Sequence, residues 1–227
     1  MSRFVMAMLA VLTCIPTLHA AIIFDNTTPD LNNFGAASNT NCGPDCQQVG
    51  DDFVLNAGES SITDIHWWGV YYPGLFQDNF TINIFNFTGG VVDAIPFYSN
   101  NVGNSATRTD TGTQQSFLNL EVYSYDLNVA AITLTPGVPY LLSIVQDLPS
   151  GVNFDWGWSL GTADGIGTAY TRTLVLPWSE TTAQMTSGSG ELAFHLTGPA
   201  SVPEPATLAL LGLGLAGLGF SRRGKLS

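Results

Sequence analysis

Basic residues are scarce in this sequence of 227 residues. It contains 6 Lys and Arg against 18 Asp and Glu, which gives a formal net charge of −12 at pH 7. Within residues 21–201 only Arg108 and Arg172 are basic, against seventeen acidic residues, so this segment carries a net charge of −15. Such a surface repels phosphate backbones and anionic lipids. We therefore expect no nucleic-acid partner and no binding to the surface of a membrane.

Familiar catalytic motifs are missing as well. The sequence has no Gly-x-Ser-x-Gly nucleophile elbow, no His-Glu-x-x-His helix and no glycine-rich phosphate loop. A glycosidase needs two carboxylates at a set distance, and the acidic residues here show no pattern that singles out a pair. We therefore predict that the protein is not an enzyme. A glycan-active hydrolase stays open as a less favoured alternative.

The first twenty residues have the features of a secretory signal peptide. Arg3 is their only charge, an uncharged apolar stretch runs over residues 4–15, and a small residue stands at position 20. This pattern predicts cleavage between Ala20 and Ala21. We expect the chain to be exported through the Sec translocon, with residues 21–201 as the exported domain.

Cysteine is rare in the exported segment. Only Cys42 and Cys46 remain there after signal removal. An even pair in an oxidising compartment predicts a disulfide, although so short a loop contributes about 2 kcal/mol at most. A redox site usually has two intervening residues rather than three, and a structural zinc site needs four ligands. Both remain as alternatives.

Residues 202–227 combine three features in a fixed order. A rigid polar motif comes first, and its two prolines hold the chain extended; it consists of Val202, Pro203, Glu204 and Pro205. The uncharged run 206–220 follows, which would span roughly 22 Å as a helix, short of the ~30 Å hydrocarbon core of a bilayer. A basic stop then ends the pattern, made of Arg222, Arg223 and Lys225. The order predicts a short transmembrane helix with its basic end in the cytoplasm; a buried helix of a soluble core is the alternative.

This order of features resembles the PEP-CTERM sorting signal of Gram-negative bacteria that make extracellular polysaccharide. The resemblance covers residues 202–227, about a tenth of the chain. It implies that an exosortase, a membrane-embedded cysteine transpeptidase, recognises the Pro-Glu-Pro motif at residues 203–205 and cuts near it. It also implies a transient stay in the inner membrane, a final place at the cell surface or in the extracellular matrix, and exopolysaccharide as a further partner.

Residues 21–201 read as a series of short strands. Segments rich in Val, Ile, Thr and aromatic residues alternate with Gly, Pro, Asn and Asp, and no amphipathic helical stretch competes with them. The candidates are residues 22–24, 52–55, 62–72, 80–87, 120–127, 132–134, 140–145, 154–158, 169–174 and 192–196. This pattern predicts an all-β fold, an antiparallel β-sandwich, and within that class a jelly roll.

Three local expectations accompany this fold. Residues 132–142 predict two paired strands joined by a turn at Pro136-Gly137. The Asn-, Ser-, Thr- and Gly-rich segment 100–116 predicts a long loop. Alternation over residues 80–87 predicts a strand with Phe80, Ile82 and Ile84 on one face. The segments 51–55, 65–69 and 142–144 also resemble, more loosely, a sandwich domain found in front of this sorting signal.

Aromatic residues are the main candidates for ligand contact. Trp67 and Trp68 must face opposite sides of a strand, whereas Trp156 and Trp158 share a side. Large aromatics dominate sandwich cores, so core packing is the first interpretation. The alternative is a carbohydrate surface that uses Trp156, Trp158 and Trp178.

Metal ligands are sparse. His66 and His195 are the only histidines of the exported domain, and a metal site would need both of them plus a carboxylate on adjacent strands. We interpret them as structural and expect no metal and no cofactor. Calcium stays open as an alternative that takes oxygen ligands; the candidate pairs are Asp51 with Asp52 and Asp155 with Asp164.

Taken together, the sequence predicts a signal peptide (1–20), an exported domain (21–201) and a sorting tail (202–227). We expect a non-enzymatic surface or matrix protein that an exosortase sorts. A carbohydrate-binding module is the alternative function.

Overall fold

The computed structural model describes residues 20–33, 35–39, 46–72, 77–116, 118–147, 156–162, 169–173, 176–180 and 190–199. Contacts within the chain group residues 20–200 into one compact unit. The described residues form fourteen β-strands and no helix. Apart from Ala20, the expected signal peptide lies outside the described residues, and so does the expected C-terminal helix.

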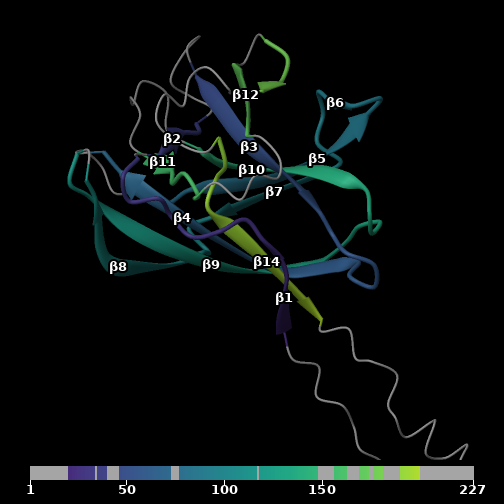
Figure 1. The fold of residues 1–227 in the computed structure, drawn as a ribbon, viewed down its shortest axis with the longest axis horizontal. Coiled ribbons are helices and arrows are strands. Elements are labelled where there is room, and N and C mark those ends of the chain that lie inside the picture. The colour runs from purple at the N-terminus through teal and green to yellow at the C-terminus, as the bar shows by residue number, and fades with distance from the viewer. Residues whose placement is uncertain are drawn as a thin grey trace, which may run out of the picture. The chain divides into compact units, whose positions relative to one another are not determined.

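Two sheets of seven strands each make up this unit (Figure 1). The strands of the first sheet are β1 (Ala20–Asp25), β2 (Ala36–Ala37), β4 (Ser61–Tyr71), β8 (Thr107–Gln115), β9 (Leu120–Thr133), β11 (Trp156–Trp158) and β14 (Phe194–Pro199). The strands of the second sheet are β3 (Gln47–Val54), β5 (Phe80–Thr88), β6 (Val91–Val92), β7 (Tyr98–Gly103), β10 (Pro139–Gln146), β12 (Tyr170–Thr173) and β13 (Ser179–Glu180).

The long strand β4 is the centre of the first sheet. One of its edges pairs with β9, which in turn pairs with β8. Its other edge pairs with β14 and β11, and β14 carries β1 as the outermost strand. In the second sheet the order is β7, β5, β10, β3, β12 and β13, with β6 also on β5. Every pairing between these strands is antiparallel.

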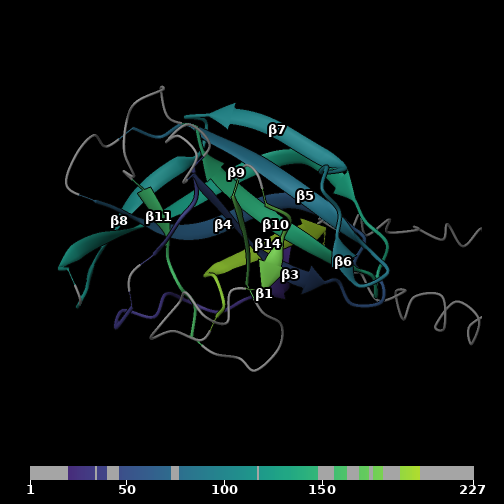
Figure 2. The ribbon, with the colours of Figure 1, turned by 90° about the horizontal axis from the view of Figure 1, so that it is seen from above.

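The hydrophobic core contains side chains from both sheets, whose strands overlap in the view of Figure 2. Its centre is a group of four buried aromatic residues from both sheets. The rings of Trp67 and Tyr125 stack with centroids 5.1 Å apart, and Phe80 meets Trp156 edge-on at 5.0 Å. Gly69 makes room for this group, because a Cβ at that position would lie 2.3 Å from Nε1 of Trp156. Such pairs contribute beyond the area they bury.

The expectation of an all-β fold with antiparallel sheets in a sandwich-like arrangement is confirmed; its assignment to the jelly rolls stays a prediction. The alternation in β5 is also confirmed, because Phe80, Ile82 and Ile84 are fully buried in the core. Phe85 on the opposite face is buried too, since Trp178 covers it. The strand therefore has two apolar sides rather than one.

The expected hairpin over residues 132–142 is wrong. The turn exists, with Gly137 at φ +74°, but β9 pairs in the first sheet and β10 in the second. The turn crosses between the layers beside the connection from β3 to β4: the N–H of Gly137 donates to the carbonyl of Leu55, and that of Leu134 to the carbonyl of Ser60. Two neighbouring crossings satisfy the backbone groups that a hairpin would have paired.

The expected loop over residues 100–116 is also wrong. This segment contains the end of β7 and all of β8. Each pairs with one neighbour only, β7 with β5 and β8 with β9, so both are edge strands. Most of their side chains face solvent, and polar residues are what an exposed edge favours. The segment therefore has the polar composition of a loop although it forms edge strands.

Candidate functional site

The two ends of the compact unit lie side by side in one antiparallel ladder. Ala20 lies opposite Pro199, and Ala21 lies opposite Gly198. Ala20 and Ala21 form the predicted signal cleavage site, and the predicted sorting motif starts at Val202, three residues after Pro199. The first residue of β1 and the last residue of β14 therefore lie side by side, and the two predicted targeting segments precede and follow them in the sequence.

Local packing fixes this ladder. Ile23 of β1 is buried, and the ring of Phe24 stacks on that of Phe194 in β14 with centroids 5.4 Å apart. A Cβ at position 198 would lie 2.2 Å from the carbonyl oxygen of Ser61. Because real Cβ atoms do not approach a backbone oxygen so closely, glycine is required there. Core packing therefore fixes the first and last strands of the domain, in addition to the hydrogen bonds between them.

A row of four side chains crosses the outer face of the first sheet at the other end of the β1–β14 ladder. Directly paired positions are held by Asp25 in β1, His195 in β14, His66 in β4 and Asp126 in β9. The two imidazole rings stack with centroids 4.1 Å apart. Nδ1 of His66 contacts the carboxylate of Asp126, and its Nε2 lies 3.0 Å from Oδ2 of Asp64. Cross-strand pairs of this kind stabilise a sheet.

The charge state of this row depends on His195. Burial lowers the pKa of His195, and the adjacent His66 lowers it further, whereas Asp25 and Asp126 act in the opposite direction. In the described part of the chain, no group of three or more His, Cys, Asp and Glu side chains is arranged to hold a metal ion. We therefore interpret the row as a link between four strands, in which burial holds the pKa of His195 below its usual value.

The three tryptophans that the carbohydrate alternative uses are buried. Trp156 and Trp158 are 0% exposed and Trp178 is 8% exposed. Trp158 donates its Nε1–H to the carbonyl of Ala193, while Trp178 meets Phe85 edge-on. A sugar could stack on Trp156 or Trp158 only if the core opened. Trp178 borders a groove.

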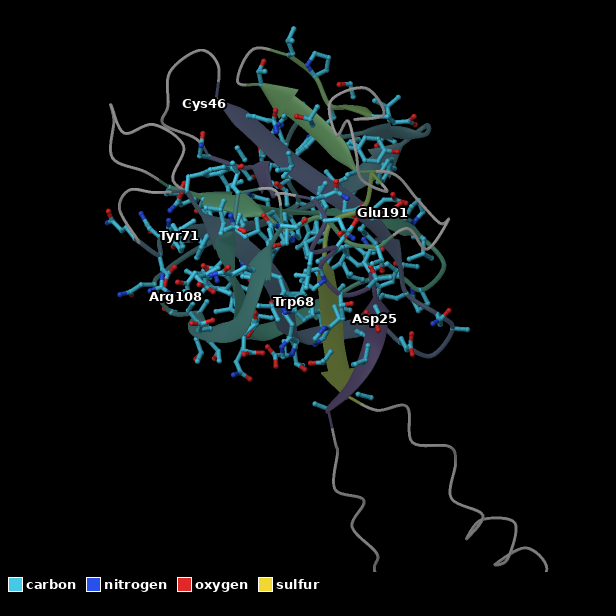
Figure 3. All side chains as sticks on the ribbon, turned by 60° about the vertical axis from the view of Figure 1, so that its left-hand side comes forward. Asp25, Cys46, Trp68, Tyr71, Arg108 and Glu191 are labelled. Atoms are coloured by element: carbon cyan, nitrogen blue, oxygen red, sulfur yellow. The ribbon has the colours of Figure 1, made fainter. Side chains whose placement is uncertain are left out.

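Asp51 takes part in a buried polar cluster. Its Oδ2 accepts hydrogen bonds from Nδ2 of Asn26 and from the N–H of Leu192. Burial raises the pKa of Asp51 well above its usual value, and the nearby carboxylate of Glu191, labelled in Figure 3, raises it further. Asp52 points to the other face of β3 and is half-buried, so these two aspartates cannot share one calcium ion.

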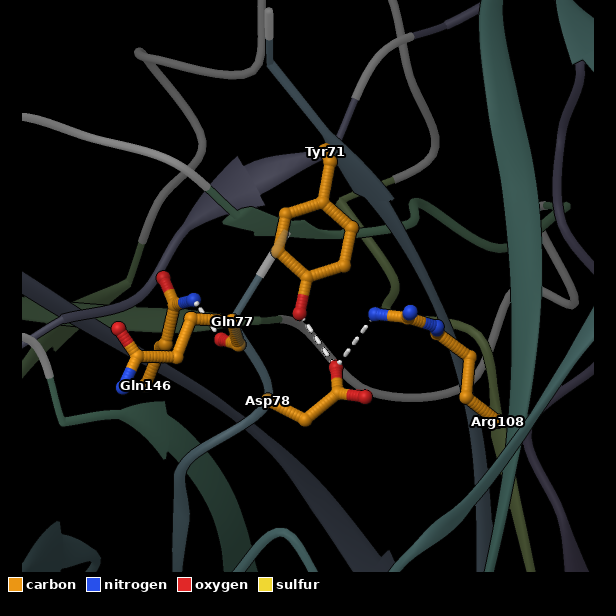
Figure 4. A network of polar contacts seen from close by, with 5 residues as sticks. All are labelled: Tyr71, Gln77, Asp78, Arg108 and Gln146. Carbon is orange, nitrogen blue, oxygen red and sulfur yellow. Dashed lines mark hydrogen bonds and ion pairs between the residues drawn. The ribbon is translucent and has the colours of Figure 1, made fainter. Parts of the chain in front are cut away.

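A second polar network joins β4 to β8 (Figure 4). The hydroxyl of Tyr71 donates to Oδ1 of Asp78, and Nη1 of Arg108 donates to the same oxygen at 3.0 Å. The guanidinium also lies over the rings of Tyr71 and Tyr123, 5.3 and 5.2 Å from their centroids. Burial and Asp78 raise the pKa of Tyr71, which keeps its phenol a donor. The network is a satisfied ion pair that fastens two strands.

Several predicted residues lie outside the described residues. They are the sorting motif Val202 to Pro205, the basic stop Arg222, Arg223 and Lys225, the cysteine Cys42, and the calcium candidates Asp155 and Asp164. Cys46 is described, and it is buried immediately before β3. Among the described residues, no helix has the length and apolar character that crossing a membrane requires.

Sequence reasoning missed the paired ends and the histidine row. Each strand involved was recognisable from its composition, and both histidines were placed in strands. Their meeting depends on the register between β1, β14 and β4, which are far apart in the sequence. The one available signal was that the first and last strand candidates of the domain, 22–24 and 192–196, were both short and apolar.

Comparisons with known proteins bear on the tail rather than on the domain. No curated protein and no solved structure matches the chain. Residues 201–223 match the family model described as the PEP-CTERM protein-sorting motif, which contains the Pro-Glu-Pro sequence at positions 203–205 and the two arginines at 222 and 223. This chain therefore carries a PEP-CTERM protein-sorting motif, the recognition signal of an exosortase substrate.

Proposed function

We propose that the protein is a non-enzymatic surface or matrix protein whose β-domain is exported and then released from the inner membrane by an exosortase. The observation that carries this proposal is the sorting motif at residues 201–223. In the proposed sequence of events, the Sec translocon exports the chain and the signal peptide is cut after Ala20. The short helix 206–220 then holds the protein in the membrane until the exosortase cuts near Pro203.

The charge of the domain supports a transient membrane stage. Residues 21–201 carry a net charge of −15, so anionic headgroups repel the domain once the tail is removed. The uncharged tail run would span roughly 22 Å, and a run shorter than the bilayer is a weak anchor. We propose that the released protein joins the extracellular matrix and associates with exopolysaccharide there.

The cysteine pair fits the same route. We propose a disulfide between Cys42 and Cys46, formed after export. Cys46 is 1% exposed and directly precedes β3. The bond would therefore lie at the end of the segment that leads from β2 in the first sheet to β3 in the second. A closed loop of this size adds about 2 kcal/mol at most.

The proposal is tested in the host by replacing Pro203, Glu204 and Pro205 together with alanine. The matched control is Glu180→Ala, which removes an exposed carboxylate from β13 and leaves the motif intact. We expect the control to be trimmed and released like the wild type, while the triple variant keeps its full C-terminus and stays in the membrane fraction. Equal trimming of the triple variant would contradict recognition of this motif.

A carbohydrate-binding module is the second candidate function. The observation that favours it is the groove beside Trp178, because Trp156 and Trp158 are enclosed in the core. A glycan contact would therefore depend on the region around Trp178.

A further inference from the structure

The groove beside Trp178 lies on the second sheet. It has a volume of about 470 Å³, within the ~300–1,000 Å³ typical of ligand sites. Its walls come from β3, β12 and the segments that follow β6 and precede β13. The lining residues that matter for recognition are Gln48, Arg172, Thr173, Leu176 and Trp178. The rest of the lining consists of Asn39, Cys46, Val92, Ala94 and Pro177, so the amide, hydroxyl, aromatic and one cationic side chain stand among apolar ones.

Arg172 is held rigidly in this groove. Its Nε donates to Oε1 of Gln48 at 2.7 Å, and its Nη1 donates to the carbonyl of Ala94 at 2.8 Å. Nε2 of Gln48 in turn donates to Oγ of Ser143. The guanidinium lies over the rings of Trp178 and Phe85, 4.6 and 5.0 Å from their centroids. These contacts fix the plane of the guanidinium, which is what two-point recognition of an oxyanion requires.

No carboxylate of the described residues forms an ion pair with Arg172. The ion pairs there join His66 to Asp64 and Asp126, and Arg108 to Asp78. Burial lowers the pKa of Arg172. A half-buried charge without a counter-ion is costly, and here it occurs in a domain with seventeen acidic residues. The natural explanation is that a ligand supplies the anion.

The groove also has unused hydrogen-bonding capacity. A guanidinium has five N–H donors, and the bonds to Gln48 and Ala94 use two of them. Oγ1 of Thr173 and Nε1 of Trp178 are buried and have no partner among the described residues. Native proteins leave few such atoms unsatisfied. A ligand rich in acceptors would use the three guanidinium donors that remain.

We propose that this groove binds a carboxylated sugar unit, a uronate, of an extracellular polysaccharide. The carboxylate meets the guanidinium of Arg172, and the neutral ring and hydroxyls lie against Trp178 and Thr173. The net negative charge of the domain repels every anion, so the local contact with Arg172 has to supply the attraction for the carboxylate. The inference rests on the proposed function in one respect, namely that the exported domain meets an acidic polysaccharide.

The test measures binding of a tetragalacturonate to the purified full chain in detergent by titration calorimetry. The carboxyl-reduced, neutral tetramer is titrated in parallel, and free galacturonate tests whether a single unit suffices. We expect the acidic tetramer to bind and the neutral one to bind at least about tenfold more weakly, since a charged hydrogen-bonded contact contributes ~1.5–3 kcal/mol. Equal affinity for both tetramers, or no binding of either at millimolar concentration, overturns the proposal.

Two pairs of variants locate the site. Arg172→Gln should weaken binding of the tetragalacturonate at least about tenfold, whereas Arg108→Gln should leave it unchanged, because Arg108 already pairs with Asp78. Leu176 is 61% exposed and lines the groove, so replacing it should not disturb the core. Leu176→Glu should weaken binding, because its carboxylate repels the ligand. Leu176→Gln adds no charge and should leave binding unchanged. The Leu176 pair decides the matter if Arg172→Gln fails to fold. Full binding by Leu176→Glu places the site elsewhere.

Failure of this inference can be told apart from failure of the proposed function. Binding is measured on purified protein and needs no exosortase, whereas trimming is measured in cells and needs no glycan. A protein that is trimmed but does not bind removes the groove proposal alone.

Discussion

Replacing Trp156 by alanine tests whether this residue belongs to the core or to a ligand surface. Trp156 is fully buried between the sheets, edge-on to Phe80 and to Tyr125. Removing a buried aromatic side chain costs about 3–5 kcal/mol in free energy of unfolding. For a domain of this size, each 1 kcal/mol lowers the melting temperature by about 2–4 °C. The melting temperature should therefore fall by roughly 6–20 °C.

Thermal unfolding followed by circular dichroism measures this change. Trp156→Phe is the matched control, because Nε1 of Trp156 has no partner among the described residues. The phenylalanine variant loses no hydrogen bond and keeps a ring, so its melting temperature should fall much less. A melting temperature of the alanine variant within about 2 °C of the wild type, well under the predicted fall, would refute the packing described here.

Gly69 sharpens the test. A Cβ at this position would collide with the indole of Trp156, so Gly69→Ala alone should be strongly destabilising. In the Trp156→Ala background the space is vacant, and the same methyl group should cost much less. The difference between the two costs is a coupling energy. Additive costs would mean that the two residues do not share this space.

Three further predictions concern charged groups and the cysteines. His195 has a lowered pKa when folded, so its contribution to stability is lost as pH falls through ~6.5; Asp51, with a raised pKa, acts in the opposite direction. Between pH 7.5 and 5 the His195→Asn variant should therefore lose less stability than the wild type loses. An identical dependence of the melting temperature on pH in both proteins would argue against this. Asp78→Asn weakens a partly exposed ion pair, and chemical unfolding should show a loss of about 1 kcal/mol, not several. If Cys42 and Cys46 are bonded, reduction should lower the free energy of unfolding by about 2 kcal/mol at most. Alkylation without a reductant should then leave the intact mass unchanged. A gain of two alkyl groups would exclude the bond.

Local patterns in the sequence predicted the central strands well. Trp67 and Trp68 were expected on opposite faces of one strand, and Trp67 is 0% exposed while Trp68 lies half-buried on the outer face. This succeeds because side-chain alternation is a property of a single strand. A buried strand can also be predicted from its apolar composition, as in β5 and β10.

The edges and the connections between sheets were not predictable in this way. The polar strand β8 has the composition of a loop, because an edge strand meets solvent. The turn at Gly137 has the residues of a hairpin, yet it crosses between layers. Both outcomes depend on neighbours that are distant in the sequence.

The candidate sites also differ in whether they are formed by one segment of the sequence or by several strands. The sorting motif is a linear signal, and the sequence sufficed to find it. The Asp25–His195–His66–Asp126 row and the groove at Arg172 are assembled from several strands. Arg172 could be noticed in the sequence only as one of two basic residues in an acidic domain.

The central claim, that an exosortase sorts this protein, is tested most directly by its intact mass and location in its own host, with and without the exosortase. We predict a secreted species that begins near Ala21 and ends near residues 202–205, present only when the enzyme is present. An untrimmed species held in the membrane of both strains would contradict it, because the tail would then be an ordinary anchor.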